Sequence, residues 1–334
     1  MNKVKFIDLF AGIGGFHQAL KNTNSECVFA SEWDKKCQEI YEKNFNLKPY
    51  GDITKIEAKV IPNHNLLCAG FPCQAFSISG KRLGFNEIRG TLFFDVVRVA
   101  KFHKPEVIFL ENVKNFLKHD DGKTINVVRS TLENLNYDVF YSLLNSSNYE
   151  IPQSRERIYI LGFRKDLNVK DFSFPKPSNK SVSLTDFLLP DKLTDEFVIN
   201  RQDIFLEKNK IIQKDIFGNY PQKTIRLGHV NKGGQGERIY SPLGHSIALT
   251  AYGGGVGSKT GLYLVNKRVR KLAPRECARI SGFPDSFRIH ENKSVCYSQF
   301  GNTVVVNVVK LIMERVFKTK CFNKKNEYSL KKAS

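Results

Sequence analysis

The sequence of 334 residues has no long hydrophobic run and no closely spaced pair of cysteines. No apolar stretch approaches the roughly 18 residues of a membrane span, which argues against a transmembrane protein. The seven cysteines form no C-x-x-C pair, and their odd number and spacing argue against a zinc site and a disulfide framework. Charged residues up to Asp8 come too early for a secretory signal. These absences predict a metal-free protein of the reducing cytoplasm.

Acidic residues are scarce: the chain has 33 Asp and Glu against 52 Lys and Arg, a formal net charge of +19. Such a surplus favours a polyanionic partner, because each neutralised phosphate releases counterions. A solvated basic surface without a specific partner explains the same surplus, so charge alone does not identify the partner. The hydrophobic fraction of 41% and the charged fraction of 25% are ordinary for a globular protein. The length suffices for one large domain and a smaller one.

The first third of the chain alternates short apolar runs with amphipathic stretches. This rhythm is typical of βαβ units and predicts an α/β fold with a doubly wound, Rossmann-like parallel sheet. Strands are expected at residues 4–10, 27–30, 65–69 and 107–110, and further β-structure at 137–144 and 157–163.

The later part of the chain has a different character. Proline and small polar residues at 175–179 indicate a linker. Ten glycines within residues 228–261 predict loops and short strands, hence a second domain of different architecture. Helical periodicity returns near the C-terminus. We therefore expect a large domain of residues 1–185 and 290–334, and a smaller, mostly β and loop domain of residues 186–289.

A glycine-rich turn, residues 11–15, separates the first predicted strand from a helix that begins at Phe16. A loop of this kind at a helix N-terminus suits a nucleotide. Glu32 lies about 20 residues after Gly12, where an acidic side chain commonly holds ribose hydroxyls. His17 occupies the third glycine position of the dinucleotide fingerprint, so the turn fits a nucleoside better than a pyrophosphate. Glycine turns also occur for purely structural reasons.

Three further side chains suit an adenine. Phe10 and Trp33 can sandwich the ring, and Asp52 can hydrogen-bond it. Core packing of the aromatic residues and a loop cap for Asp52 are the structural alternatives, and position alone leaves both interpretations open.

Cys73 lies in a loop shaped by glycine and proline, residues 70–74, just past the third predicted strand. Ligand sites of open α/β sheets gather at this edge. A thiolate is the strongest nucleophile that side chains offer near neutral pH, although a lone cysteine is more often a small buried hydrophobe. Glu111 follows the fourth strand at the same edge, where a carboxyl group can act as a general acid. Arg155 and Arg157, on one face of a strand, can orient a thiol, carbonyl or phosphate, or form surface ion pairs.

Six segments, in this order, resemble the motifs of the cytosine-C5 methyltransferase family. They span most of the chain, and their residue types are those that the family's chemistry fixes. The segments are residues 8–15, 70–74, 111–113, 153–157, 270–277 and 299–304. The resemblance implies an S-adenosylmethionine-dependent methyltransferase domain with a smaller target-recognition domain.

The resemblance also implies a covalent mechanism. Cys73 would attack C6 of cytosine, so that C5 can take the methyl group of S-adenosylmethionine. Glu111 would hydrogen-bond or protonate N3, Arg155 would hold the base's O2, and Arg157 would position Glu111. Loss of the C5 proton and elimination of the thiol complete the cycle. The implied cofactor contacts are Asp8, Phe10, Gly12, Ile13, Gly15, Glu32, Trp33, Asp52, Ile53, Pro72, Leu92, Asn302 and Val304.

A base inside a duplex cannot reach a thiol, so the target cytosine must flip out of double-stranded DNA. Residues 77–84, basic and hinged by glycine, are then a loop that closes on DNA; otherwise they are an ordinary solvated loop. By resemblance, Ser79 and Gln235 would fill the space that the base leaves. The implied DNA contacts are Ser79, Lys81, Arg82, Arg89, Gln235, Glu237, Arg238, Tyr252 and Gly255.

Sequence choice is expected in residues 232–238. Arginine can bond guanine through O6 and N7, and glutamate can accept from the cytosine amino group, so Glu237 and Arg238 suit a C/G-containing site. These residues, with 251–255, resemble the recognition loops of GCGC-specific members, which implies GCGC with its first cytosine modified. The region departs from the family pattern at His229, Asn231, residues 242–243 and Ala248, the last of which usually is threonine.

Two other functions stay open: a transfer-RNA cytosine-C5 methyltransferase and a catalytically silent DNA-binding regulator. The glycine-rich recognition region disfavours the first, and the presence of Cys73 and Glu111 disfavours the second. A base-amino methyltransferase is disfavoured because the sequence has no Asn/Asp-Pro-Pro-aromatic tetrapeptide. We expect a cytoplasmic monomer that associates with the nucleoid through DNA. The resemblance suggests a companion restriction endonuclease of the same specificity.

Overall fold

The larger of two main sheets carries the predicted Rossmann-like core. The computed structural model describes residues 3–72, 92–207, 212–215 and 217–322. Its six-stranded sheet has the order β2-β1-β3-β4-β7-β5. The strands are β1 (Val4–Leu9), β2 (Ser25–Ser31), β3 (Leu66–Ala69), β4 (Val107–Val113), β5 (Tyr137–Asn145) and β7 (Glu156–Arg164). Each overlaps a segment where β-structure is predicted.

The sheet is parallel only in part. Strands β1 to β4 pair in parallel, whereas β7 runs antiparallel to both β4 and β5. The segment between β5 and β7, residues 146–155, is too short for a parallel crossover, which needs a dozen residues or more. The predicted parallel arrangement therefore ends at β4.

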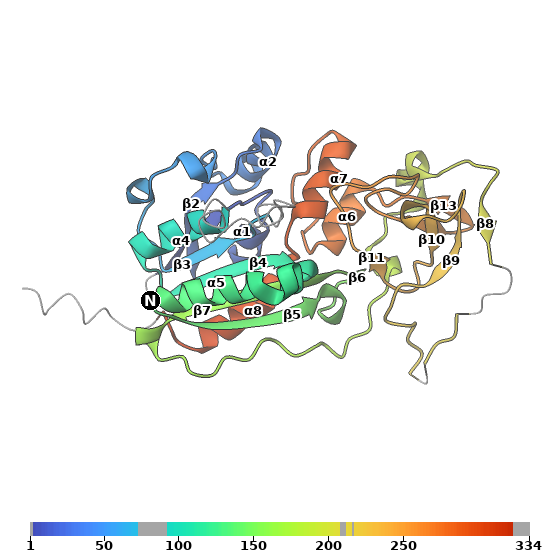
Figure 1. The fold of residues 1–334 in the computed structure, drawn as a ribbon. Helices are drawn as coiled ribbons and strands as arrows, with labels where there is room; N and C mark the ends of the chain where they lie inside the picture. The colour runs from blue at the N-terminus through green and yellow to red at the C-terminus, as the bar shows by residue number, and fades with distance from the viewer. Residues whose placement is uncertain (1–2, 73–91, 208–211, 216, 323–334) are drawn as a thin grey trace, which may run out of the picture.

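Helices cover both faces of this sheet (Figure 1). On β1, Phe6 packs in one core with Phe16 and residues of the C-terminal helix, and Ile7 packs in the other core with Phe93. Successive strand residues point to opposite faces, so strands covered on both sides read as continuous apolar runs. The helices are α1 (Gly15–Leu20), α2 (Lys35–Phe45), α4 (Leu92–His103), α5 (Lys123–Asn134) and α8 (Val306–Lys318). No helix in the described part of the chain is long and apolar enough to cross a membrane.

The smaller five-stranded sheet lies in the region predicted to form loops and short strands. Its order is β13-β12-β10-β9-β8. The bounds are β8 (Phe205–Leu206), β9 (Arg226–His229), β10 (Arg238–Tyr240), β12 (Leu262–Val265) and β13 (Arg268–Arg270). A small apolar cluster that includes Ile239 and Leu262 supports it. Leu272 and Phe283 instead pack into the large core beside α8, so the boundary at residue 289 stays a prediction.

Short elements connect the two sheets. β6 (Gln153–Ser154) pairs in parallel with β11 (Ser246–Ile247), and α6 (Pro274–Ile280) and α7 (Lys293–Asn302) lead from β13 back to α8. Sequence periodicity does not indicate α7, because its apolar residues form no stripe along one face.

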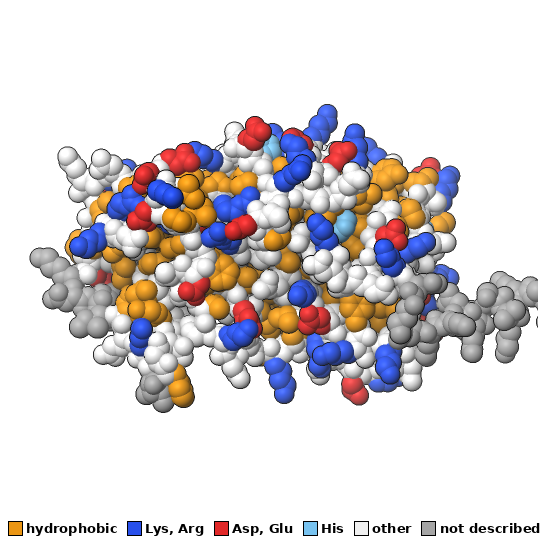
Figure 2. Space-filling model, turned by 180° about the vertical axis from the view of Figure 1, so that it is seen from behind, with side chains coloured by type: hydrophobic (Ala, Val, Ile, Leu, Met, Phe, Trp, Pro, Cys, Tyr) orange, Lys and Arg blue, Asp and Glu red, His pale blue; other side chains and the backbone are white. Residues whose placement is uncertain are grey.

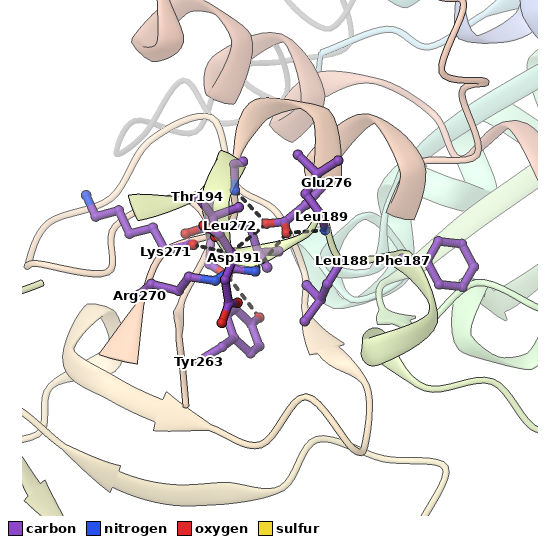
Figure 3. Close-up of polar contacts among 12 residues, drawn as sticks. Phe187, Leu188, Leu189, Asp191, Thr194, Tyr263, Arg270, Lys271, Leu272 and Glu276 are labelled. Carbon is purple, nitrogen blue, oxygen red and sulfur yellow. Dashed lines mark hydrogen bonds and ion pairs between the residues drawn. The ribbon is translucent and has the colours of Figure 1, made fainter. Parts of the chain in front are cut away.

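A buried ion pair fixes the smaller sheet to α6 (Figure 3). Arg270 ends β13 and Glu276 lies in α6; both side chains are fully buried, and two hydrogen bonds of 2.8 Å join them. The Glu276 carboxylate also accepts hydrogen bonds from the backbone N–H groups of Leu189 and Ala273, at 2.8 and 2.7 Å. Removing either partner of a buried pair is strongly destabilising. The pair therefore holds the backbone at Leu189, β13 and α6 in one arrangement.

Candidate active site

The loop that leads to Cys73 lies beside Glu111. Ala69 of β3 pairs with Leu110 of β4, which brings the two strand ends together. Asn112 Nδ2 donates a hydrogen bond of 2.9 Å to the Phe71 carbonyl and so anchors the loop to β4. Cys73 itself lies outside the described residues, and so do four predicted DNA contacts: Ser79, Lys81, Arg82 and Arg89.

Glu111 is buried, with 7% of its surface exposed, and it is paired with Arg157. Glu111 lies opposite Tyr159 in the β4–β7 ladder, so Arg157 is its diagonal neighbour on the same face. Arg157 Nε lies 3.2 Å from Glu111 Oε1. Burial raises the pKa of the Glu111 carboxyl, and the nearby Arg157 and Arg155 guanidinium groups oppose that rise. A carboxyl in this setting keeps its proton to higher pH than an ordinary glutamate does.

Arg155 is placed differently from Arg157. It follows β6, is only 3% exposed, and its Nη1 donates to the Leu249 carbonyl at 2.9 Å. Its Nη2 donates to the carbonyls of Gly301 and Thr303, at 3.0 and 2.8 Å. Only Nε lacks a partner among the described residues. Burial lowers the pKa of the guanidinium to about 9. These three bonds use three of the five guanidinium N–H groups and leave the Nε–H and one Nη1–H. The contact expected between Arg155 and the base's O2 stays a prediction.

The glycine-rich turn after β1 is held by Glu32. Its carboxylate accepts hydrogen bonds from the backbone N–H groups of Gly12 and Asp34, both at 2.8 Å. Gly12 has a φ of 55°, and a Cβ placed there would meet nothing within 4 Å, so open space lies in front of the turn. A Cβ at Gly15, by contrast, would collide with Val304. Glycine at this position therefore allows the loop after α7 to pack closely against the turn.

The surroundings of this turn fit a nucleoside cofactor. Trp33 is 79% exposed and free to stack on a base, and Glu32 is the acidic residue next to it. Both carboxylate oxygens of the fully buried Asp8 lack a hydrogen-bond partner among the described residues, and burial raises the pKa of that carboxyl. Asp52 Oδ1 accepts from the Thr54 N–H at 3.0 Å, so the loop-cap alternative holds for one of its oxygens.

Other predicted cofactor residues border the same strand ends. Phe10 is partly buried and has a positive φ of 54°, Ile53 is buried, and Pro72 is exposed. Asn302 ends α7, and Leu92 is the first residue of α4. Gln299 of α7 donates from Nε2 to the Lys36 carbonyl at 3.1 Å, which connects α7 to the start of α2. The residues predicted from separate motifs thus border one region, at the carboxyl ends of β1 and its neighbours.

The predicted recognition residues lie on two loops that support one another. The Glu237 carboxylate accepts from Asn231 Nδ2 at 2.8 Å and from the Gly234 N–H at 2.9 Å, and these bonds lower its pKa. The Gly257 N–H donates to the Gly236 carbonyl at 2.7 Å, joining the loop of Gln235 to that of Gly255. Arg238 is partly buried, and its Nε has no partner among the described residues. Tyr252 is exposed.

Three residues that support the site are absent from the predicted set. Asn112 and Gln153 hold backbone groups; Gln153 bonds Ile280 and Leu249, at 2.8 and 3.1 Å. Gly301 lies against the backbone of residues 250–251. Each of the three lies inside a motif of the sequence analysis, and its being polar or glycine was the signal that could have marked it as a supporting residue. The partners lie so far along the chain that their identity could not be read from spacing.

The family described as C-5 cytosine-specific DNA methylase matches residues 4–318. The chain belongs to this family. It is a DNA (cytosine-5-)-methyltransferase, as the catalytic motifs imply, and the family uses S-adenosylmethionine as methyl donor.

Two curated relatives show how far the methylase resembles known enzymes. It is 54% identical over 309 residues to the Type II methyltransferase M.HhaI of Haemophilus parahaemolyticus, covering 92% of this chain and 93% of the relative. It is 40% identical over 336 residues to the Type II methyltransferase M.HpaII of Haemophilus parainfluenzae, covering 94% and 89%. Both matches are to Type II methyltransferases and cover nearly their full length.

A solved structure supports the Rossmann-like fold. The S. pombe Dnmt2 methyltransferase superposes with a TM-score of 0.71 at 21% identity, covering 95% of this methylase and 99% of that chain. At this identity the likeness concerns the fold alone.

Proposed function

We propose that this methylase modifies C5 of a flipped-out cytosine in duplex DNA, at the first cytosine of GCGC. One observation carries the catalytic part: the buried Glu111 carboxyl, paired with Arg157, borders the loop that leads to Cys73. The identity with M.HhaI, together with Glu237 and Arg238, supports the target sequence.

The proposed chemistry begins at C6 of the cytosine. The Cys73 thiolate adds to C6, and negative charge develops on the ring at N3. Glu111 donates a hydrogen bond or a proton to N3 and so neutralises this charge. Arg157 holds the Glu111 carboxyl in place. S-adenosylmethionine supplies the methyl group that C5 takes. Loss of the C5 proton and elimination of the Cys73 thiol then restore the aromatic ring and free the enzyme.

The cofactor would lie in front of the Gly12 turn. Glu32, already fixed by two backbone N–H groups, can accept from ribose hydroxyls through its remaining lone pairs. The exposed face of Trp33 can stack on the adenine. We include in this proposal the other cofactor contacts that the sequence analysis predicts.

Site choice would depend on Arg238. Arg238→Ala is expected to relax discrimination for guanine by roughly 5- to 150-fold, since a bidentate arginine–guanine contact contributes about 1–3 kcal/mol. Bisulfite sequencing of DNA from cells expressing the protein alone would measure the change and test the GCGC target. Lys223→Ala, at an exposed lysine outside residues 232–238, is the charge-matched control and should leave site choice unchanged. Unchanged selectivity in Arg238→Ala would remove Arg238 from the recognition set.

DNA binding is expected to weaken steeply with salt. The formal net charge is +19, and on the face in Figure 2 the Lys and Arg side chains are spread among acidic ones. Each phosphate contact should add roughly one unit to the slope of log affinity against log salt concentration. Fluorescence anisotropy with a labelled duplex over a salt series measures the slope. A flat response would contradict extensive phosphate contact.

The proposed setting is that of a monomeric modification enzyme in the cytoplasm, next to a restriction endonuclease of the same specificity. Action on one strand at a time needs one protomer only. The transfer-RNA alternative is tested by comparing methyl incorporation into duplex DNA and into transfer RNA. Methylation of transfer RNA but not of DNA would replace the proposal.

A further inference from the structure

The backbone near the recognition loops and the backbone near the cofactor region meet at one side chain, Arg155. Its guanidinium donates to Leu249, which follows β11, and to Gly301 and Thr303, which flank Asn302. Gln153 repeats the pattern: its Oε1 accepts from the Leu249 N–H, and its Nε2 donates to the Ile280 carbonyl. The guanidinium of Arg155 can join these segments because its N–H groups point in several fixed directions and donate to carbonyls of separate segments at the same time.

Gly301 brings the two segments into direct contact. A methyl group at this position would collide with backbone atoms of Thr250 and Ala251. Gly301 lies in α7, and its φ is not in the left-handed range, so its own conformation does not require glycine. The glycine therefore serves the close approach of the 250–251 backbone to the end of α7.

The contact continues along α7. Lys259 Nζ bonds Ser294 and Ser298, and Ser298 Oγ donates to the Ala251 carbonyl at 3.2 Å. On its other side α7 reaches the backbone at Lys36, close to Trp33. The segment that precedes Tyr252 thus rests on a helix that borders the proposed cofactor site.

We propose that Arg155 and Gly301 are positioning residues that couple DNA binding at the recognition loops to cofactor binding. The proposal rests on the proposed function, since it takes duplex DNA and S-adenosylmethionine as the two ligands. Each ligand would stabilise the shared junction of residues 249–251 and 301–303 in the arrangement that the structure shows, so the second ligand would bind to a junction already stabilised by the first. The coupling would therefore be positive and reciprocal.

Gly301→Ala tests the coupling directly. The affinity of S-adenosylhomocysteine, which permits no methyl transfer, is measured by calorimetry with and without a duplex containing GCGC. In the native protein the duplex should raise this affinity by roughly 5- to 150-fold, the range typical of coupled sites. In Gly301→Ala this ratio of affinities with and without DNA should fall close to one, because the added methyl group displaces residues 250–251 from α7. Gly51→Ala, where a Cβ meets nothing within 4 Å, is the matched control and should keep the native factor.

Arg155→Lys is the second variant and tests the coupling if Gly301→Ala does not fold. The single ammonium nitrogen of lysine cannot donate to Leu249 and to Gly301 and Thr303 together, so the ratio of affinities with and without DNA should again fall. Arg129→Lys, at an exposed arginine of α5, is its control. Melting temperatures are recorded for every variant. A lower melting temperature with an undiminished factor would assign both residues a purely structural role and overturn the proposal, as would an equal fall in the controls. A native protein that binds neither ligand would instead refute the proposed function.

Discussion

Glu111→Gln is expected to slow methyl transfer by roughly 10²–10⁴-fold, the usual contribution of a positioned general acid. Glutamine keeps the shape and can still donate an N–H hydrogen bond, but it cannot transfer a proton to N3. The substitution also removes the ion pair between Glu111 and Arg157, whose Nε lies 3.2 Å from Glu111 Oε1, so the side chain at position 111 is held less firmly. Single-turnover transfer of a radiolabelled methyl group to a GCGC duplex measures the chemical step without product release.

The pH dependence distinguishes proton transfer from mere hydrogen bonding. Burial raises the pKa of Glu111, so its protonated form persists above the range of an ordinary glutamate and is lost as pH rises through the raised value. The native rate should carry a falling alkaline limb from Glu111, and Glu111→Gln should lack it. Glu156→Gln changes a half-exposed carboxylate that pairs with Lys114, and should leave both rate and profile unchanged. A native rate in Glu111→Gln would exclude the general-acid role.

The sheet could be predicted from the sequence because its strands are buried on both faces. Residues 107–110 form an unbroken apolar run, and the structure buries all four within β4. The direction of β7 was not predicted, because the expected strands leave twelve residues between them, enough for a parallel crossover, whereas the strands of the structure leave ten. Helix α7 was not predicted either, because the residues that it buries contact several different elements and leave no periodic stripe.

The two arginines show where sequence reasoning about the site ends. Their spacing placed Arg155 and Arg157 together, and the expected proximity of Arg157 to Glu111 is present in the structure. The partners of Arg155 are backbone carbonyls 94, 146 and 148 residues away, and carbonyls are identical at every position. No pattern of side chains could therefore have indicated them. Motifs identify which residues gather, while the fold decides which of their atoms are already occupied.

Cys73→Ala is expected to abolish methyl transfer and to leave cofactor binding intact, because alanine offers no atom that can add to C6. The six other cysteines are poor substitutes: burial raises the pKa of each thiol, to about 12 at Cys27. Cys27→Ala is therefore the matched control and should retain activity.

A duplex with 5-fluorocytosine at the target makes the covalent step visible. Elimination of the Cys73 thiol requires loss of a proton from C5, and fluorine at C5 cannot leave in that way. After methyl transfer, the native enzyme and Cys27→Ala should both stay attached to the DNA and migrate as an adduct under denaturing conditions. Cys73→Ala should form none while binding S-adenosylhomocysteine with native affinity. An adduct in Cys73→Ala would place the nucleophile elsewhere, and turnover without any adduct would exclude covalent catalysis altogether.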